Sequence, residues 1–74
     1  MKATDARFVI CVQNAEYPAS LETRKIYQEV SDPDAGPDLI RVIDESGEDY
    51  LFPRVLFIPV ELSGEIKAAL LRAS

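Results

Sequence analysis

The chain has 74 residues with one Cys and no His, and its net charge is −5 at pH 7. This length suffices for one domain, and a single thiol excludes an internal disulfide and a cysteine–histidine zinc site. The acidic charge disfavours nucleic-acid binding, because affinity for phosphates depends on basic residues. Without His, the chain lacks the usual metal ligand and the side chain best suited to acid–base chemistry at neutral pH.

The N-terminal residues predict neither a signal peptide nor a membrane span. Residues 1–7 lack the apolar run of a signal peptide, and the apolar stretch 8–12 is too short to span a bilayer. A lone thiol is typical of a reducing compartment. We therefore expect a soluble, cytoplasmic protein without membrane contact.

The first half of the chain predicts two strands. Residues 7–14 are apolar on both alternating faces, so we expect a central strand covered on both sides. A loop follows over 14–20. Residues 21–25 have good helix propensity, but the alternation and the β-branched and aromatic residues after them favour a strand. We interpret 23–24 as a turn and 25–30 as a strand.

The second half predicts a hairpin, a short final strand and a helix. Residues 31–38 are rich in Pro, Gly and Asp and predict a loop. Strands over 39–44 and 49–52 flank a turn in which Gly47 takes a positive φ. Pro53 ends the second strand, one 3-10 turn spans 53–56, and a strand follows over 57–60.

A C-terminal helix is predicted over 63–73. Ser63 suits its N-cap, and an apolar face repeats at helical spacing. This face consists of Ile66, Ala69, Leu70 and Ala73. It would dock on a partner helix, on a second copy in a weak homodimer, or across the open end of its own barrel.

Three groups of residues resemble motifs of small bacterial and phage proteins with a Src-homology-3-like (SH3-like) barrel. The groups are Leu21, Lys25, Tyr27 and Val30; Asp44, Gly47 and Glu48; and Phe52, Pro53 and Phe57. The resemblance covers most of residues 7–60. It implies a single all-β domain over 1–74: a five-stranded antiparallel SH3-like barrel with a short C-terminal α-helix.

One residue departs from the family pattern. Arg24 stands where these proteins usually have Gly in a turn. Either Arg24 accepts a strained backbone, at a cost of about 1 kcal/mol, or the turn has a different shape.

An aromatic groove is the candidate partner site. Signalling members of the wider fold use such residues, with acids nearby, to bind polyproline-II peptides. The candidate residues here are Tyr17, Tyr50, Phe52, Pro53, Glu48 and Asp49, with Glu16 as a further acid. The alternative is that these aromatics only cover the ends of a small barrel. Alternation places Tyr50 and Phe52 on one face and Leu51 on the other, so one set belongs to the core.

The other chemically suggestive residues have simpler interpretations. Asp32, Asp34 and Asp38 faintly resemble a calcium loop, but further ligands are missing, so we predict no metal. The hairpin acids are expected to be solvated, with Asp44 bonded to the turn. Cys11 lies among apolar residues and is interpreted as part of the core.

The sequence therefore predicts a protein without catalytic residues or cofactor. We expect a protein–protein interaction module or small accessory factor whose partner is an unidentified protein or peptide. The alternative is a small nucleic-acid-binding barrel, which the acidic charge disfavours.

Overall fold

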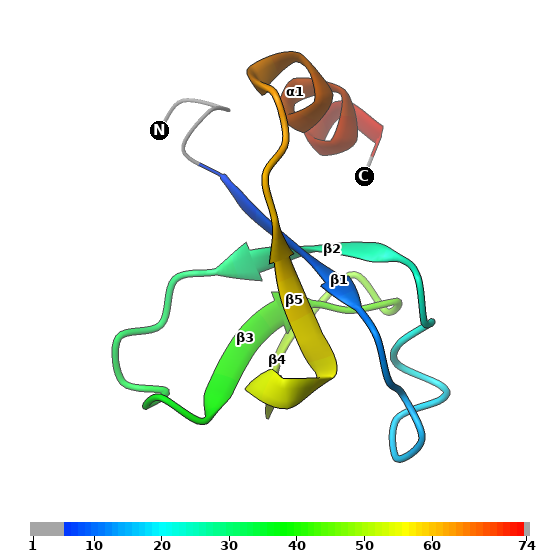
Figure 1. The fold of residues 1–74 in the computed structure, drawn as a ribbon, viewed down its shortest axis with the longest axis vertical. Helices are drawn as coiled ribbons and strands as arrows, with labels where there is room; N and C mark the ends of the chain where they lie inside the picture. The colour runs from blue at the N-terminus through cyan, green and yellow to red at the C-terminus, as the bar shows by residue number, and fades with distance from the viewer. Residues whose placement is uncertain (1–5, 74) are drawn as a thin grey trace.

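Five short strands and one helix form the fold in the computed structural model, which describes residues 6–73 (Figure 1). In chain order they are β1 (Arg7–Cys11), β2 (Ile26–Val30), β3 (Leu39–Ile43), β4 (Asp49–Pro53), the 3-10 turn η2 (Arg54–Leu56), β5 (Phe57–Val60) and α1 (Gly64–Ala73). Every predicted element is present. The alternation in β2 prevails over the helix propensity of the residues before it.

The strands form one antiparallel sheet in the order β4-β3-β2-β1-β5. Val9 pairs with Tyr27, Ile10 with Ile58, and Ile40 with Phe52. The all-β prediction with a C-terminal helix is confirmed at this level, but closure into a barrel is not shown. Among the described residues β4 and β5 are the two edges of the sheet, because β4 pairs only with β3 and β5 only with β1.

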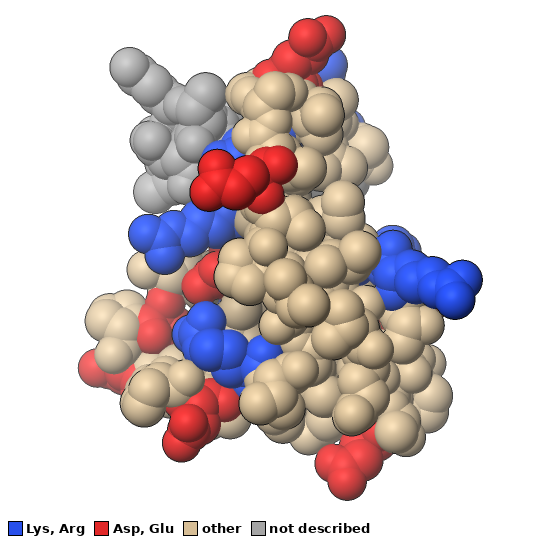
Figure 2. Space-filling model, in the orientation of Figure 1, with Lys and Arg blue, Asp and Glu red and all other residues tan. Residues whose placement is uncertain are grey.

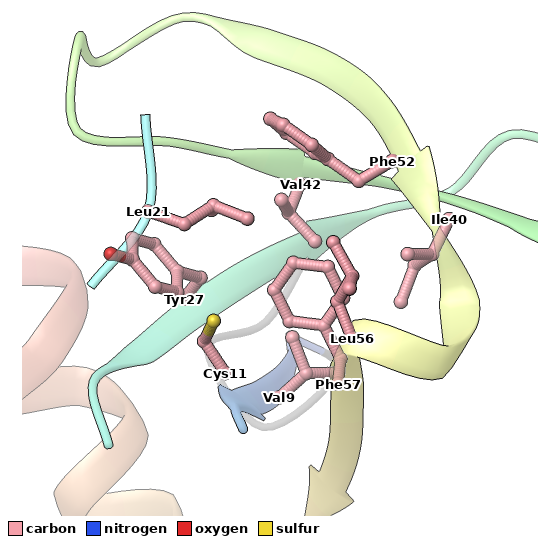
Figure 3. Packing of buried hydrophobic residues seen from close by; sticks show 9 residues of the cluster. All are labelled: Val9, Cys11, Leu21, Tyr27, Ile40, Val42, Phe52, Leu56 and Phe57. Atoms are coloured by element: carbon pink, nitrogen blue, oxygen red, sulfur yellow. The ribbon is translucent and has the colours of Figure 1, made fainter. Parts of the chain in front are cut away.

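The strongly curved sheet surrounds one hydrophobic core (Figure 3). The core draws residues from all five strands, from the loop before β2 and from η2. Its members are Val9, Cys11, Leu21, Tyr27, Ile40, Val42, Phe52, Leu56 and Phe57. Three of its rings meet in series, edge to face: Tyr27 with Phe57, and Phe57 with Phe52. Such packing brings distant segments of a short chain into one buried cluster.

Arg24 takes the strained backbone, with a φ of 70°. Its N–H donates to the carbonyl of Cys11 at 2.7 Å, and the N–H of Cys11 donates to the carbonyl of Lys25 at 2.9 Å. These two bonds extend the β1–β2 pairing into the turn. A position with this backbone favours Gly, which lacks a Cβ and adopts positive φ without strain.

Helix α1 covers only part of the sheet. Ser63 caps it as predicted, accepting a bond from the N–H of Ile66 at 3.2 Å. The helix lies beyond one end of β1 and β5 (Figure 1), where Leu70 and Ala73 line a groove with the buried Phe8. No residue of α1 is buried, and Ile66 and Ala69 are exposed. Most of the predicted apolar face therefore remains on the surface. No helix within residues 6–73 has the length and apolarity needed to cross a bilayer.

β1 lies inside the sheet, between β2 and β5, as predicted, but its second face is only partly covered. Val9 and Cys11 face the core, and on the opposite face only Phe8 is buried. Ile10 is half-buried, and Val12, just after the strand, is 47% exposed. The short helix reaches only one end of the strand, so the other end keeps its apolar side chains at the surface.

Candidate functional site

The predicted aromatic residues are divided between core and surface. Phe52 is 4% exposed and packs in the core, where Tyr17 meets it edge to face with 5.2 Å between ring centroids. Tyr17 and Pro53 are half-buried. Tyr50 lies on the same face of β4 as Phe52 but near the end of the strand, and it is 48% exposed. Tyr17 and Tyr50 thus offer accessible ring surface, whereas Phe52 is buried and contacts the ring of Tyr17.

The acids of the hairpin have different roles. Asp44 is buried, and its Oδ1 accepts bonds from the N–H of Ser46 at 2.8 Å and from the hydroxyl of Ser46. This confirms that Asp44 holds the turn, in which Gly47 has a φ of 85°. Glu48 and Asp49 are exposed and form no ion pair with any other described residue. These two carboxylates are therefore available to a partner.

Sequence reasoning missed a polar cluster of Lys25, Tyr27 and Glu45. Oε1 of Glu45 lies 2.8 Å from Nζ of Lys25, and Oε2 accepts a bond of 2.6 Å from the hydroxyl of Tyr27. The hydrogen bond from Lys25, followed by that from Tyr27, lowers the pKa of the Glu45 carboxyl. Burial, the largest cause, raises the pKa of the Tyr27 hydroxyl. The i, i+2 spacing of Lys25 and Tyr27 signalled a shared face, but nothing in the sequence placed Glu45 beside them.

An open groove of about 570 Å³ lies between α1 and the turn after β3. Its floor is apolar and includes Phe8, Ile26 and Ile43, and Leu70 forms part of the wall. Its charged members are the Lys25–Glu45 pair, which is already formed, and Asp44, which is bonded to the turn. The groove can accept an apolar group, but it gathers no free pair of acid and base.

Cys11 is part of the core, as predicted. Its side chain is fully buried, and burial raises the pKa of the thiol, which opposes formation of the reactive thiolate. The loop acid Asp32 is also engaged, because its Oδ2 lies 2.8 Å from Nε of Arg41. Within residues 6–73, no three acids or other ligand side chains gather as a metal site would require.

The outer surface of β1 and β5 carries a row of aliphatic side chains. Ile10 pairs with Ile58 across the two strands, and Ile58 is 53% exposed. Val60 extends the row along β5, and alternation along the chain from Ile10 places Val12 at its other end. These four residues define what we call the apolar face. Figure 2 shows the surface over β5 free of acidic and basic side chains, which lie to either side of it and above and below it. This surface is the most extensive uncharged feature in that view.

Comparison of the chain with protein-family models, with curated proteins and with solved structures finds no match. A functional assignment therefore depends on the residues and contacts described above.

Proposed function

We propose that this chain is a non-enzymatic protein-interaction module that binds its partner through the apolar face. The observation that carries the proposal is the exposure of Ile58 and Val12 beside Ile10 on a surface without charges. Contiguous exposed apolar surface is costly in water and commonly marks a protein–protein interface. A partner covering this face would bury side chains that the short helix leaves open.

The state of the polar groups supports a binding role over a catalytic one. A nucleophile or general base needs an accessible group with a partner poised to move a proton. Cys11 is buried, and Glu45 is held by Lys25 and Tyr27. Asp44 is committed to the turn. These contacts stabilise the fold and leave the groups little freedom for chemistry.

The proposed fold family is the SH3-like barrel of small bacterial and phage proteins. Support comes from the curved antiparallel sheet of five strands and from Arg24, whose left-handed backbone occupies the position where that family usually has Gly. The resemblance suggests a small accessory factor of a bacterial or phage cytoplasm. Fold alone assigns no partner, so the surface carries the functional argument.

A matched pair of variants tests the apolar face. Immobilised wild-type chain should capture a specific partner from bacterial lysate, and Ile58→Lys should abolish capture by placing a charge in the interface. Val55→Lys is the control, because Val55 is 82% exposed on η2, outside the apolar face. Circular dichroism checks that each variant folds. The proposal fails if no specific protein is recovered, or if Ile58→Lys and Val55→Lys capture it equally well.

A further inference from the structure

The backbone of β4 has an unpaired edge. The N–H of Asp44 donates to the carbonyl of Glu48 at 3.0 Å, and the N–H of Arg54 donates to the carbonyl of Asp38 at 2.9 Å. Hydrogen-bonded and non-bonded pairs alternate along an antiparallel ladder. Tyr50 and Phe52 are therefore the β4 residues that bond to β3.

It follows that Asp49 and Leu51 point their N–H and C=O groups away from the sheet. In the described part of the chain no other segment pairs with this edge, since β4 is the last strand in the sheet order. Leu51 is 39% exposed and Asp49 is exposed as well, so solvent reaches both residues. The edge thus offers alternating donors and acceptors at the spacing that an added strand requires.

The opposite edge, on β5, lacks these donors. The N–H of Val12 donates to the carbonyl of Leu56 at 2.8 Å, so Val12 and Leu56 form a hydrogen-bonded pair of the β1–β5 ladder. By the same alternation, the backbone nitrogens of Phe57 and Pro59 point outward, away from β1. The N–H of Phe57 is already bonded to the carbonyl of Arg54, and Pro59 has no N–H. Proline at such a position is a known means of blocking strand addition. Of the two edges, only β4 is ready to pair.

The charges around β4 indicate the chemistry of an added strand. Glu48 and Asp49 are exposed without an ion pair among the described residues. Both nearby arginines are engaged: Arg41 pairs with Asp32, and Arg54 donates to the carbonyls of Pro37 and Leu39. The edge therefore presents uncompensated negative charge at one end, which favours a basic partner.

We propose that β4 accepts an extended, basic peptide segment of a partner protein as a sixth antiparallel strand. The segment would place Lys or Arg near Glu48 and Asp49 and an apolar side chain beside Leu51. This proposal rests on the proposed interaction function and adds a second contact surface to it. A second copy fits less well, because pairing about Leu51 sets Pro53, which lacks an N–H, against Asp49 and adds another charge of −5.

Nuclear magnetic resonance with a defined probe tests the edge. The probe is acetyl-Lys-Val-Thr-Val-Lys-amide, and its control is the same peptide with Glu in place of Lys. Titration of the basic peptide into ¹⁵N-labelled chain should shift the amides of Asp49 and Leu51 most and slow their hydrogen exchange. The acidic peptide should bind at least about tenfold more weakly, a difference of about 1.4 kcal/mol. Shifts centred elsewhere, or equal binding of both peptides, would refute the proposal.

Two substitutions at one position separate backbone from side chain. Leu51→Pro removes the outward N–H and replaces the leucine side chain by the proline ring, whereas Leu51→Ala keeps the N–H and only shortens the side chain. We expect Leu51→Pro to lower the affinity for the basic peptide about tenfold or more, and Leu51→Ala to lower this affinity less than about threefold. Equal loss in both would show that the edge hydrogen bonds do not bind the peptide. If Leu51→Pro does not fold, the amide exchange of the wild-type complex decides the question.

The outcomes for β4 and for the proposed function can be distinguished. Suppose that a captured partner binds wild type and Leu51→Pro equally well but does not bind Ile58→Lys. This result would support the proposed function and refute the β4 site. If capture returns nothing specific, the function fails, while the peptide titration still decides whether β4 pairs with an added strand. Concentration-dependent dimerisation that Leu51→Pro abolishes would assign β4 to a second copy and overturn the proposal.

Discussion

The hydroxyl of Tyr27 donates a 2.6 Å hydrogen bond to Oε2 of Glu45 and accepts one of 2.6 Å from the N–H of Glu22. Tyr27 belongs to the buried face of β2, whereas Glu45 lies in the turn after β3. The N–H of Glu45 also donates to the carbonyl of Ser20 at 3.0 Å. One hydroxyl therefore joins the loop before β2 to the β3–β4 hairpin.

Removing that hydroxyl should weaken the fold. We expect Tyr27→Phe to lower the free energy of unfolding by about 1.5 kcal/mol, because it deletes a bond to a carboxylate and leaves the Glu22 N–H without its partner. Urea denaturation followed by circular dichroism measures the change. Tyr50→Phe is the control, since the Tyr50 hydroxyl has no bond to any described residue, and it should stay within about 0.5 kcal/mol of wild type. A similar loss in both variants would contradict this role.

Stability should fall in acid, partly through Glu45. The bonds from Lys25 and Tyr27 hold the pKa of Glu45 below its ordinary value of 4.5, so the folded state binds this proton less readily than the unfolded state. Its contribution is complete above pH 4.5 and disappears as the pH falls through the lower folded pKa. Glu45→Gln should therefore lose less thermal stability than wild type between pH 6 and pH 3. If thermal stability falls equally in the two proteins between pH 6 and pH 3, Glu45 does not contribute to the acid sensitivity of the fold.

Replacing Arg24 by Gly should stabilise the protein. A left-handed backbone costs a residue with a Cβ about 1 kcal/mol, whereas Gly adopts it freely. The gain is partly offset by the greater freedom of Gly in the unfolded chain. We expect Arg24→Gly to raise the free energy of unfolding by about 0.5 kcal/mol. Thr23→Gly, at a neighbouring position without positive φ, should lower it by a similar amount. Urea denaturation measures whether each substitution raises or lowers the free energy of unfolding. A lower free energy of unfolding in both variants would refute the strain at Arg24.

Cys11 should resist modification in the folded protein. Its side chain is fully buried, and burial raises the pKa of the thiol, so little reactive thiolate is accessible. Labelling with a thiol-reactive disulfide reagent at pH 8 should be slow in buffer and complete within minutes in 6 M guanidinium chloride. The rate in buffer should follow the opening of the core and rise with urea. Immediate labelling of the native chain would mean that the β1 core position is accessible.

The elements themselves could be predicted because their signals are local. Gly47 marks the hairpin turn and takes a φ of 85°, and Ser63 marks the start of the helix that it caps. The alternation before Val30 indicated a strand. Backbone conformation at such places depends on a residue and its close neighbours, so sequence spacing suffices to locate it.

Which surfaces the protein exposes was decided by tertiary structure. Alternation places Tyr50 and Phe52 on the same face of β4, yet Phe52 is buried in the core against Tyr17 and Phe57, whereas Tyr50, near the end of the strand, is 48% exposed. Strand order and register also determine three other features: the Tyr27–Glu45 hydrogen bond, the apolar face that includes Ile58, and the unpaired edge of β4 at Leu51. These follow from contacts between distant segments, and a shift of one residue would turn every side chain to the other face.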